Sequence, residues 1–517
     1  MGIEEENRLI KDRIEKLKAL RELGVNPYPY SFDKTHNAKD ILDKYGDLKE
    51  EDKTMDKVSV AGRIMTLRNM GKACFTHIQD QTGKIQLYIR KDDVGADTYK
   101  LLKKLDIGDI IGAKGTVFKT RTGETSVYVE SFEILTKSLR PLPEKYHGIQ
   151  DKELRYRKRY LDLIFNQDVK DTFRKRSRMI AAVREFFAKE DFMEVETPAL
   201  QIIYGGANAR PFVTHINAWD MKMYLSISPE LYLKRLIVGG FESVYTICKN
   251  FRNEGVDKTH NPEFTMLECY KSWVDYNDMM RITEQCFEHA CMKINGTTKV
   301  KHIYNDEEVE IDFKAPWPRL TMIDALKEHA NIDVAPLDDE GMKQLLTNYN
   351  VEMEGQYTKG LATQLLFEEL VEDKLVQPVH IIDHPKETTP LCKEHREHPD
   401  LIERFESFCL GAELCNAYSE LNDPILQRKL LEEQAEELRG GADEAHPMDE
   451  DFVESIEYGM TPTGGLGIGI DRMAICLIGA ETIRDVILFP TMKPVGKEKT
   501  VEQQDLDLKE DIKKSLS

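Results

Sequence analysis

The sequence predicts an α+β protein in which a small β-barrel precedes a larger domain built on an antiparallel sheet with helices. Residues 58–136 contain five short runs of alternating apolar and polar residues, separated by glycine-rich or charged turns. Such a series is typical of a five-stranded barrel. From residue 172 onward, amphipathic segments of helical period alternate with strand-like runs. At 517 residues the chain exceeds one ordinary core, so we expect two or three domains.

The composition indicates a soluble globular protein. Hydrophobic residues make up 41% and charged residues 32%, and no apolar run reaches the length of a membrane span. The first residues, MGIEEENRL, lack the features of a signal peptide, so we expect a cytoplasmic protein without a membrane partner. Nine cysteines without a CxxC pair favour free thiols. A net charge of −20 means that any nucleic acid must meet a local basic surface.

The beginning of the chain predicts a basic amphipathic helix over residues 5–23, which Gly24 ends. Its basic face could contact an RNA backbone or could simply be solvated while the apolar face docks. We assign residues 1–50 to an N-terminal helical segment and 51–140 to the barrel. The second domain spans 141–495 after a proline-containing linker, with a charged, largely helical stretch at 278–372 and a polar tail at 496–517.

Residues 244–273 hold the most informative polar residues. Val244–Phe251 and Phe264–Tyr270 read as two strands joined by a polar loop, which predicts a hairpin. One face of the second strand, from Phe264 through Met266 and Glu268 to Tyr270, would span roughly 20 Å at about 3.3 Å per residue. That face could hold a long, two-part ligand. Arg252, Glu254 and His260 in the loop could bind a phosphate or carboxylate, although a solvated surface hairpin is the alternative.

The loop and second strand, FRNEG followed by HNPEFTMLE, resemble motif 2 of the class II aminoacyl-tRNA synthetases. SPELYLK at 228–234 is similar to the lysyl-tRNA synthetase version of the neighbouring segment. The resemblance implies that Arg252 binds the α-phosphate and the substrate carboxylate, and that Phe264 stacks on adenine. It also implies ATP contacts from Glu254, His260 and Asn261.

Two segments before the hairpin fit the same resemblance. Residues 172–188 predict a helix and 192–200 a strand that ends near Pro198, and together they resemble motif 1, the dimer interface of class II synthetases. We therefore expect a homodimer. YGGANARPF at 204–212 is a glycine-rich turn whose backbone, at Gly206, could approach a ligand closely.

Residues 403–424 place four polar side chains in an otherwise apolar segment. Asn416 and Glu420 share a face whether the segment is a helix or a strand. The resemblance implies that Glu406 and Glu413 bind Mg²⁺ beside ATP, for which one or two carboxylates are typical. A solvated acidic edge is the weaker interpretation, because apolar residues flank every carboxylate. Asp423 and Pro424 predict the start of a helix that runs to Gly440.

TPTGGLGIGIDRM at 461–473 is neither a Walker A loop nor GxGxxG, which disfavours the P-loop classes. It resembles motif 3, and the resemblance implies ATP contacts from Gly469 and Arg472. Gly464 stands where many relatives have alanine. A possible zinc cluster of His384, Cys392, His395 and His398 has one cysteine among three histidines in a polar loop. We interpret it as an ordinary loop.

The barrel resembles the OB-fold with which subclass IIb synthetases read the anticodon. Phe75 and Gln86 match positions that stack on and hydrogen-bond to anticodon bases, and Arg63 is a further candidate. A lone Phe75 would otherwise be read as a core residue. The family also uses a late-strand glutamate, a role that neither Glu130 nor Glu133 matches cleanly.

The resemblance covers nearly the whole chain and implies a lysyl-tRNA synthetase of subclass IIb. Such an enzyme uses ATP and Mg²⁺ to ligate L-lysine to tRNA(Lys) through a lysyl-adenylate. Arg252, His260 and Arg472 would stabilise the reacting phosphates; Glu230 and Glu268 would bind the α-ammonium of lysine, with Asn416 nearby; Tyr270 and Glu420 would bind its ε-ammonium.

Three alternatives are weaker. An aspartyl- or asparaginyl-tRNA synthetase shares the architecture but carries an arginine at the place of Glu420. A paralogue that lysylates a protein would lack the anticodon domain. A non-enzymatic RNA-binding module would not need the residues of motifs 2 and 3.

Overall fold

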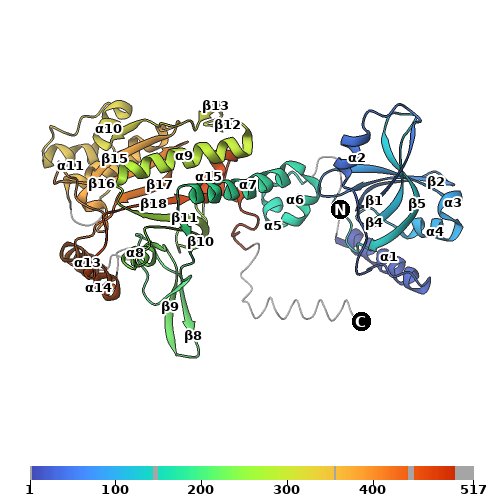
Figure 1. Ribbon diagram of the computed structural model, residues 1–517, viewed down its shortest axis with the longest axis horizontal. Coiled ribbons are helices and arrows are strands. Elements are labelled where there is room, and N and C mark those ends of the chain that lie inside the picture. Colours follow the sequence, from blue (N-terminus) through green and yellow to red (C-terminus); the bar gives the residue numbers. More distant parts are fainter. Residues whose placement is uncertain (1–2, 144–148, 354–356, 440–446, 495–517) are drawn as a thin grey trace. The chain divides into compact units, whose positions relative to one another are not determined.

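The computed structural model describes residues 3–143, 149–353, 357–439 and 447–494. The predicted polar tail at 496–517 and residues 144–148 of the predicted linker lie outside these residues. The chain separates into two compact units, Met1–Gln150 and Asp151–Ser517 (Figure 1). Each unit is described by itself.

The sheet of the N-terminal unit closes in a ring of five strands, as the alternating runs predict. The strands pair in the order β1-β2-β3-β5-β4, and β4 pairs back to β1. All neighbours are antiparallel except β3 and β5, which are parallel. This is the predicted OB-fold. Its strands are β1 (Lys53–Asn69), β2 (Ala73–Gln79), β3 (Lys84–Arg90), β4 (Ile110–Lys119) and β5 (Thr125–Thr136).

Period-two alternation fills the inside of this ring with β-branched and other aliphatic side chains, including Val58, Val60 and Ile64 of β1. Helix α1 (Ile3–Glu22) adds Leu20 to the same core, and α2 (Ala38–Tyr45) adds Ile41. Gly24 follows α1 with a φ of +74°, a left-handed conformation that favours glycine. The smaller helices are α3 (Lys91–Val94), α4 (Ala96–Leu101) and η1 (Leu102–Lys104).

The basic face of α1 is partly used for docking. Arg13 donates hydrogen bonds to the backbone oxygens of Ile107, Ser138 and Arg140. The helix is thus held on its own barrel by a buried guanidinium. Four other basic side chains of α1 are exposed, so an RNA contact on that face stays a prediction: Arg8, Lys11, Lys18 and Arg21.

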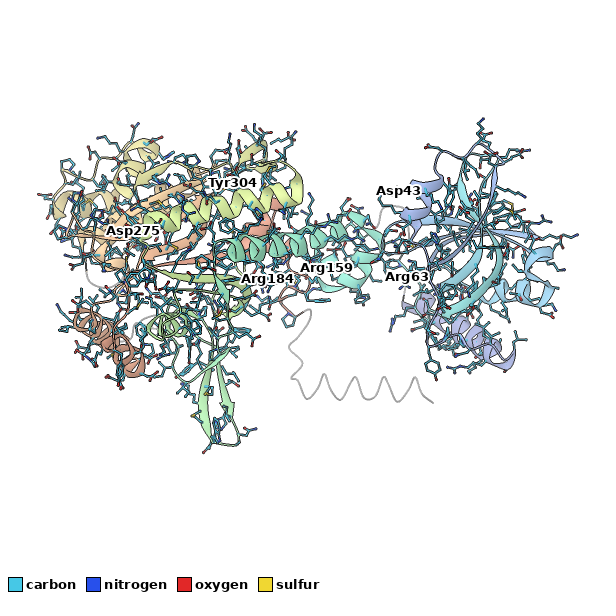
Figure 2. The ribbon with its side chains drawn as sticks, viewed as in Figure 1. Asp43, Arg63, Arg159, Arg184, Asp275 and Tyr304 are labelled. Atoms are coloured by element: carbon cyan, nitrogen blue, oxygen red, sulfur yellow. The ribbon has the colours of Figure 1, made fainter. Side chains whose placement is uncertain are left out.

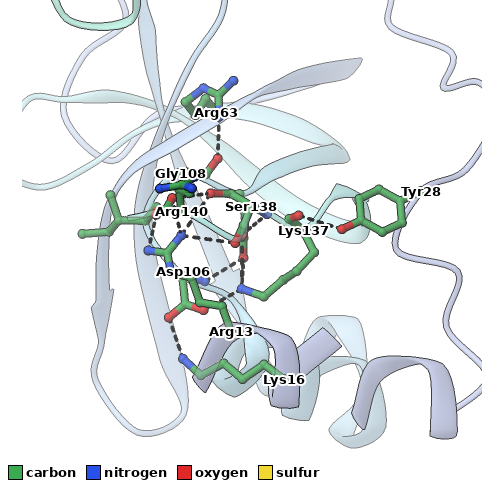
Figure 3. Close-up of polar contacts among 11 residues, drawn as sticks. Arg13, Lys16, Tyr28, Arg63, Asp106, Gly108, Lys137, Ser138 and Arg140 are labelled. Atoms are coloured by element: carbon green, nitrogen blue, oxygen red, sulfur yellow. Dashed lines mark hydrogen bonds and ion pairs between the residues drawn. The ribbon is translucent and has the colours of Figure 1, made fainter. Parts of the chain in front are cut away.

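A buried ion cluster centred on Lys137 joins α1 to the end of β5 (Figure 3). Lys137 Nζ lies 2.5 Å from Asp106 Oδ2 and 2.9 Å from Asp109 Oδ2. The other oxygen of Asp106 lies 2.5 Å from Lys16 Nζ, and that of Asp109 accepts a 2.8 Å hydrogen bond from the backbone N–H of Ser138. Every carboxylate oxygen in this cluster therefore has a partner.

The second unit is built on an eight-stranded sheet in the order β14-β15-β16-β17-β18-β11-β10-β6. Neighbours are antiparallel except at the two edges, where β14 with β15 and β10 with β6 are parallel. This confirms the predicted antiparallel catalytic domain. The strands are β6 (Met193–Glu194), β10 (Ser243–Phe251), β11 (Glu263–Ser272), β14 (Arg319–Thr321), β15 (Val379–Pro385), β16 (Leu401–Cys409), β17 (Ala412–Ser419) and β18 (Thr463–Gly469).

Helices α7 (Gln167–Lys189), α9 (Tyr276–Asn295) and α15 (Ile470–Ile478) cover one face of this sheet (Figure 1). Leu267 and Cys269 of β11 point into the core beneath them. By alternation, Met266, Glu268 and Tyr270 then point to the opposite face, as the sequence predicts. Asp275 caps the start of α9, where its side chain accepts a hydrogen bond from the backbone of Asn277 (Figure 2).

Residues 278–372 are less uniformly helical than their sequence suggests. Most of α9 falls in this range but belongs to the main core. A hairpin of β12 (Lys299–Tyr304) and β13 (Glu307–Asp312) follows it. Helices α10 (Met322–Ala330), α11 (Asp339–Asn348) and α12 (Lys359–Leu370) then form a separate apolar cluster, followed by η2 (Glu372–Lys374).

The strand predicted over 192–200 is largely absent. The segment contributes β6 and the first residue of β7 (Leu200–Gln201), and its middle is irregular. Pro198 lies in this irregular stretch and has no N–H to donate. Strand β7 pairs with β9 (Met221–Leu225), which pairs with β8 (Val213–Ile216) in a small separate sheet.

The remaining elements of this unit are helical, and η3 (Lys386–Thr388) is a short 3₁₀ turn. Asp423 Oδ1 accepts hydrogen bonds from the backbone of Ile425 and Leu426, so α13 begins where predicted; its last described residue is Arg439. The helices of the described chain include none with the length and hydropathy of a membrane span. The remaining helices are α5 (Lys152–Arg157), α6 (Arg159–Phe165), α8 (Glu230–Val238), α13 (Pro424–Arg439), α14 (Glu450–Glu457) and α16 (Ile483–Val486).

Candidate active site

A cavity of about 370 Å³ lies on the face of the large sheet that the helices leave open. Strands β11, β16, β17 and β18 form its floor, and the β10–β11 loop and the start of α8 contribute to its walls. Every residue of this unit that the sequence singled out as a site residue lines it. These are Gly206, Glu230, Arg252, Glu254, His260, Asn261, Phe264, Glu268, Tyr270, Glu406, Glu413, Asn416, Glu420, Gly469 and Arg472.

Arg252 follows directly after β10 and lies at one end of the cavity. Its backbone N–H donates a 2.9 Å hydrogen bond to Pro262, which closes the loop. Its guanidinium lies over the ring of Phe264, 5.2 Å from the centroid. Its Nε is buried and has no hydrogen-bond partner among the described residues. A buried guanidinium donor without a partner suits an anion entering the cavity.

Two further basic side chains face the same end of the cavity. His260 Nε2 lies 3.3 Å from a terminal nitrogen of Arg472, while its Nδ1 lies 2.9 Å from Asp257 Oδ2. Arg472, in the first turn of α15, also donates a 2.7 Å hydrogen bond to the backbone oxygen of Glu413. This end of the cavity can therefore receive several phosphate charges.

Glu406 of β16 and Glu413 of β17 lie beside these cations on paired strands. Arg404, which the sequence analysis did not single out, contacts Glu406 and donates a 3.1 Å hydrogen bond to Asn416. The clue was available, because Arg404 and Glu406 are two residues apart on a strand and share a face. Burial raises the pKa of Glu372 to about 7, with Glu406 and Glu413 adding to the effect. The carboxylates here exceed what local cations neutralise.

The opposite end of the cavity is lined by glutamates. Glu268 accepts a 2.9 Å hydrogen bond from Ser228 Oγ, and the Tyr270 hydroxyl lies 3.4 Å from its other oxygen. Burial, helped by Glu230, raises the pKa of Glu268 to about 8. Glu420, directly after β17, is 1% exposed, and its Oε1 has no hydrogen-bond partner among the described residues.

Two residues at this end were missed by sequence analysis. Tyr418 lines the cavity between Asn416 and Glu420, and period two on β17 could have identified it. Lys234 lies behind the wall, with Nζ 2.6 Å from Glu230 Oε1 and 2.5 Å from Glu420 Oε2. Its i,i+4 spacing from Glu230 on α8 was the available signal.

Two glycines make room for these carboxylates. A Cβ at Gly465 of β18 would lie 1.9 Å from Glu420 Oε1, closer than any real contact. Gly206 has a φ of +85°, and a Cβ there would lie 2.8 Å from Glu230 Cβ. At Gly206, where the sequence predicts a close approach of the backbone to a ligand, and at Gly465, the missing side chain makes room for a glutamate.

On the OB-fold, the predicted anticodon residues are only partly brought together. Phe75 stacks on Tyr88 with centroids 4.6 Å apart, and the next pair along the same outer face contains Gln86. Arg63 instead pairs with Gln79, four residues from Phe75 along β2, and donates a 2.7 Å hydrogen bond to the Gly108 oxygen (Figure 3). Arg63 therefore lies on the same outer face as Phe75 but is displaced along the strands, and its guanidinium is engaged within the fold.

A glutamate that the sequence analysis did not consider adjoins Gln86. Glu124, in the turn before β5, accepts a 2.6 Å hydrogen bond from Gln86 Nε2. Of the glutamates considered, Glu130 pairs with Lys57, and Glu133 lies opposite Gly112. No strand alternation marks Glu124, because it lies in a turn.

No group of three or more His, Cys, Asp or Glu side chains that could hold a metal ion occurs in the part of the chain that the structure describes. His395 and His398 stack on each other at 5.1 Å, and the buried His384 lies 3.1 Å from the Ile381 oxygen. A cation on Glu406 and Glu413 would need its other ligands from a bound substrate or water.

Comparison with known proteins identifies the family to which the chain belongs. Residues 151–493 match the tRNA synthetases class II (D, K and N), and residues 58–135 match the OB-fold nucleic acid binding domain. The chain is 53% identical over 493 residues to a lysine–tRNA ligase of Clostridium novyi (strain NT), covering 94% of this chain and 95% of that protein. A lysine–tRNA ligase of Clostridium botulinum (strain Loch Maree / Type A3) is 54% identical over 496 residues, covering 95% and 97%. One from Pelotomaculum thermopropionicum is 52% identical over 497 residues, covering 95% and 96%. The chain therefore belongs to the class II aminoacyl-tRNA synthetases, in the lysyl-tRNA synthetase family.

Proposed function

We propose that the chain uses ATP to ligate L-lysine to tRNA(Lys) at this cavity. The observation that carries the proposal is the opposite chemistry of the two ends. One end presents the unpartnered guanidinium Nε of Arg252, and the other presents the unpartnered carboxylate oxygen of Glu420. A ligand that is anionic at one end and ends in an ammonium at the other satisfies both.

The reaction proceeds in two steps. A carboxylate oxygen of lysine attacks the α-phosphorus of ATP, and the bond to the bridging oxygen breaks to release pyrophosphate. A ribose hydroxyl at the end of the tRNA then attacks the carbonyl carbon of the lysyl-adenylate. AMP leaves with the electron pair of the broken bond, and the hydroxyl proton is released. No side chain is needed as a nucleophile, so catalysis consists of positioning and charge stabilisation.

The phosphate end contributes that stabilisation. Arg252 binds the α-phosphate and the lysine carboxylate, and His260 with Arg472 meets the outer phosphates; all three line the same end of the cavity. Adenine stacks on Phe264, whose ring already packs against Arg252. Glu254, Asn261 and Gly469 complete the ATP contacts.

The carboxylate end selects the amino acid. Glu230 and Glu268 bind the α-ammonium beside the backbone of Gly206, and Asn416 lies near the carboxylate. Tyr270 and Glu420 bind the ε-ammonium. An aspartate or asparagine side chain would meet buried carboxylates here, which disfavours those substrates.

Glu406 and Glu413 fit a magnesium ion. Mg²⁺ in ATP sites takes one or two carboxylates together with phosphate oxygens and water. The two glutamates supply that donor set beside the cations, and their charge adds to burial in raising the pKa of Glu372. A bound Mg²⁺ would neutralise phosphate charge, while Arg404 fixes the orientation of Glu406.

Recognition of tRNA involves the outer face of the OB-fold. Phe75 and Tyr88 offer a stacking platform, and Gln86 offers an amide for a base edge, as suits the bases of an anticodon. Membership of the lysyl-tRNA synthetase family implies that this anticodon is UUU or CUU. Gln86 would exchange its bond to Glu124 for one to a base. Arg63 stays a weaker candidate, because its guanidinium is engaged with Gly108.

We further propose a homodimer formed by the end of the motif 1 region and the small sheet of β7, β9 and β8 that follows it. This stretch exposes six large apolar side chains, which a second copy would cover. The elution volume in size-exclusion chromatography and the mass from light scattering would test for this dimer. A cytoplasmic location stays a prediction from the sequence. The exposed apolar side chains are Met193, Leu200, Ile202, Ile203, Val213 and Trp219.

ATP–pyrophosphate exchange with each amino acid in turn tests the function. We expect exchange with lysine and none with aspartate or asparagine. Arg252→Ala should lower the rate about 10²- to 10³-fold, the usual effect of removing one transition-state donor. Arg281→Ala is the matched control, since Arg281 lies on α9 and pairs with Glu190 at 3.3 Å. Exchange driven by another amino acid, or an Arg252→Ala rate like that of the control, would contradict the proposal.

A further inference from the structure

Lys234 is a fully buried cation that contacts two glutamates of the cavity from behind. Its exposed fraction is 0%, and its Nζ lies 2.6 Å from Glu230 Oε1 and 2.5 Å from Glu420 Oε2. The two carboxylates come from different elements, the first turn of α8 and the segment directly after β17. Lys234 therefore ties the helix to the strand through an ion bridge.

The ion bridge is not electrically neutral when both of its carboxyl groups are ionised. Two carboxylates and one ammonium carry one net negative charge, and Glu420 Oε1 has no hydrogen-bond partner among the described residues. That oxygen belongs to a residue of the cavity wall, and the absence of a side chain at Gly465 leaves room for it. A buried carboxylate oxygen without a partner is costly, so a ligand that donates to it is strongly favoured.

Resting on the function proposed above, we propose that Lys234 is a positioning residue that sets the side-chain end of the cavity to one net negative charge. It thereby favours the ionised form of Glu420 and aims Oε1 at the ε-ammonium of lysine. The pocket then matches an amino acid with a single positive charge on its side chain. Without Lys234, the Glu230–Glu420 pair would carry two negative charges in a buried site and would take up a proton instead.

The groups around Glu420 support this arrangement. It is faced by Lys234 and Glu230 of α8, Glu268 and Tyr270 of β11, Tyr418 of β17, and Cys392. Burial raises the pKa of Glu420 to about 8; Lys234 opposes that rise and Glu230 adds to it. Burial by itself lowers the pKa of Lys234, but Glu230 and Glu420 raise it overall, so Lys234 stays an ammonium. Removing Lys234 must therefore move the titration of Glu420 further upward.

The test is Lys234→Met, which keeps the length of the side chain and removes its charge. Lysine-dependent ATP–pyrophosphate exchange is measured from pH 6.5 to about 9, a range that spans the raised pKa of Glu420. L-Norleucine, whose side chain ends in a methyl group, serves as a competitive inhibitor. At pH 7 we expect the KM for lysine to rise about 10- to 100-fold, because each unit of pKa rise is a tenfold cost. The KM for ATP, kcat at saturating lysine and the Ki of norleucine should stay unchanged.

The pH profile separates this role from packing. The lysine KM is expected to rise as the pH falls. In Lys234→Met this rise should begin at a higher pH than in the wild type. Lys234→Arg, which keeps the charge, should restore the wild-type pH profile. Lys137→Met is the matched control. It also removes a buried lysine between two carboxylates, but in the N-terminal unit (Figure 3), so it should alter stability and leave the lysine KM and its pH profile alone.

Other outcomes overturn the proposal. A lysine KM and pH profile like those of the wild type would mean that Lys234 does not set the charge. Equal losses for lysine and norleucine would make it a packing residue. If thermal unfolding shows that Lys234→Met does not fold, Lys234→Gln, which can still donate to one carboxylate, carries the same comparison. Failure of the wild type to use lysine at all would instead contradict the proposed function.

Discussion

The two units each bury a lysine between two carboxylates, yet the clusters differ in one respect. Around Lys137, every oxygen of Asp106 and Asp109 has a partner within the fold. Around Lys234, an oxygen of Glu420 has none among the described residues and belongs to a cavity wall. A buried ion cluster that is satisfied internally fastens the fold, whereas one with an unsatisfied oxygen at a cavity is prepared for a ligand.

The pKa values of the two clusters diverge in the same way. Burial tends to raise the pKa of Asp106, but hydrogen bonds from Lys137 and Lys16 lower it overall. Burial raises the pKa of Glu420 to about 8 in spite of Lys234. The same pair of residue types therefore gives a carboxylate that holds its charge firmly in one unit and weakly in the other.

The largest expected effect concerns the internally satisfied cluster. Lys137→Met leaves the buried Asp109 without its counter-ion and Asp106 with Lys16 alone, which should cost about 3–5 kcal/mol of unfolding free energy in the N-terminal unit. Urea unfolding followed by a probe in the OB-fold measures this loss. Asp97→Asn, on the exposed partner of Lys100, is the control and should change little. Equal unfolding free energies for Lys137→Met and the wild type would contradict this prediction.

The cluster at the cavity should respond in binding. Glu420→Gln removes the carboxylate that meets the ε-ammonium, so the lysine KM should rise by about 30- to 1,000-fold, the effect of about 2–4 kcal/mol for a truncated buried charge pair. The KM for ATP should change little. Asp109→Asn makes the same chemical change in the other cluster and should leave the lysine KM intact. If both variants bind lysine like the wild type, the ε-ammonium is held elsewhere.

A third prediction asks whether the N-terminal unit has a ligand face of its own. Phe75→Ala should spare lysyl-adenylate formation but lower kcat/KM for tRNA about 10- to 100-fold, as expected when one stacking platform worth about 1–3 kcal/mol is lost. The loss should shrink with an anticodon-mutant tRNA in a double-mutant cycle. Additive losses would mean that Phe75 does not contact the anticodon.

The smallest effect is a pH dependence. Carboxyl groups with a pKa of about 8 at Glu268 and Glu420 must lose a proton before they bind an ammonium, so lysine affinity should be lost as pH falls through 8. The change should be at most tenfold per pH unit for each group. Stability that depends on Asp106, whose pKa is lowered, is present above about 3.9 and lost only in more acidic solution. A lysine KM that is flat between pH 6.5 and 8.5 would contradict this assignment.

Sequence predicted many residues that line the cavity partly because several of them lie on strands, while their catalytic and binding roles stay predictions. Met266, Glu268 and Tyr270 follow period two, and motif 2 specified the loop that holds Arg252. The fold class followed from the same alternation. The strand predicted near Pro198 was wrong in extent, because a proline offers no N–H to a ladder.

Residues that act through tertiary contacts could not be predicted in the same way. Lys234 is one of many lysines on helices, and only the meeting of α8 with the end of β17 places it beside Glu420. Glu124 lies in a turn, where no period indicates which side chain meets Gln86. Arg63 shares the outer face with Phe75 by alternation, but the register of β1 and β2 separates them.

Gly465 gives a protein engineer a steric route to altered substrate choice, because its missing side chain makes room for Glu420. A methyl group there would lie 1.9 Å from Glu420 Oε1, so Gly465→Ala would force the glutamate out of its present position. The backbone of β18, and not only the acidic side chain, therefore helps to set where the carboxylate meets the substrate. A library varied at 465 together with 420 would change that position without rebuilding the phosphate end.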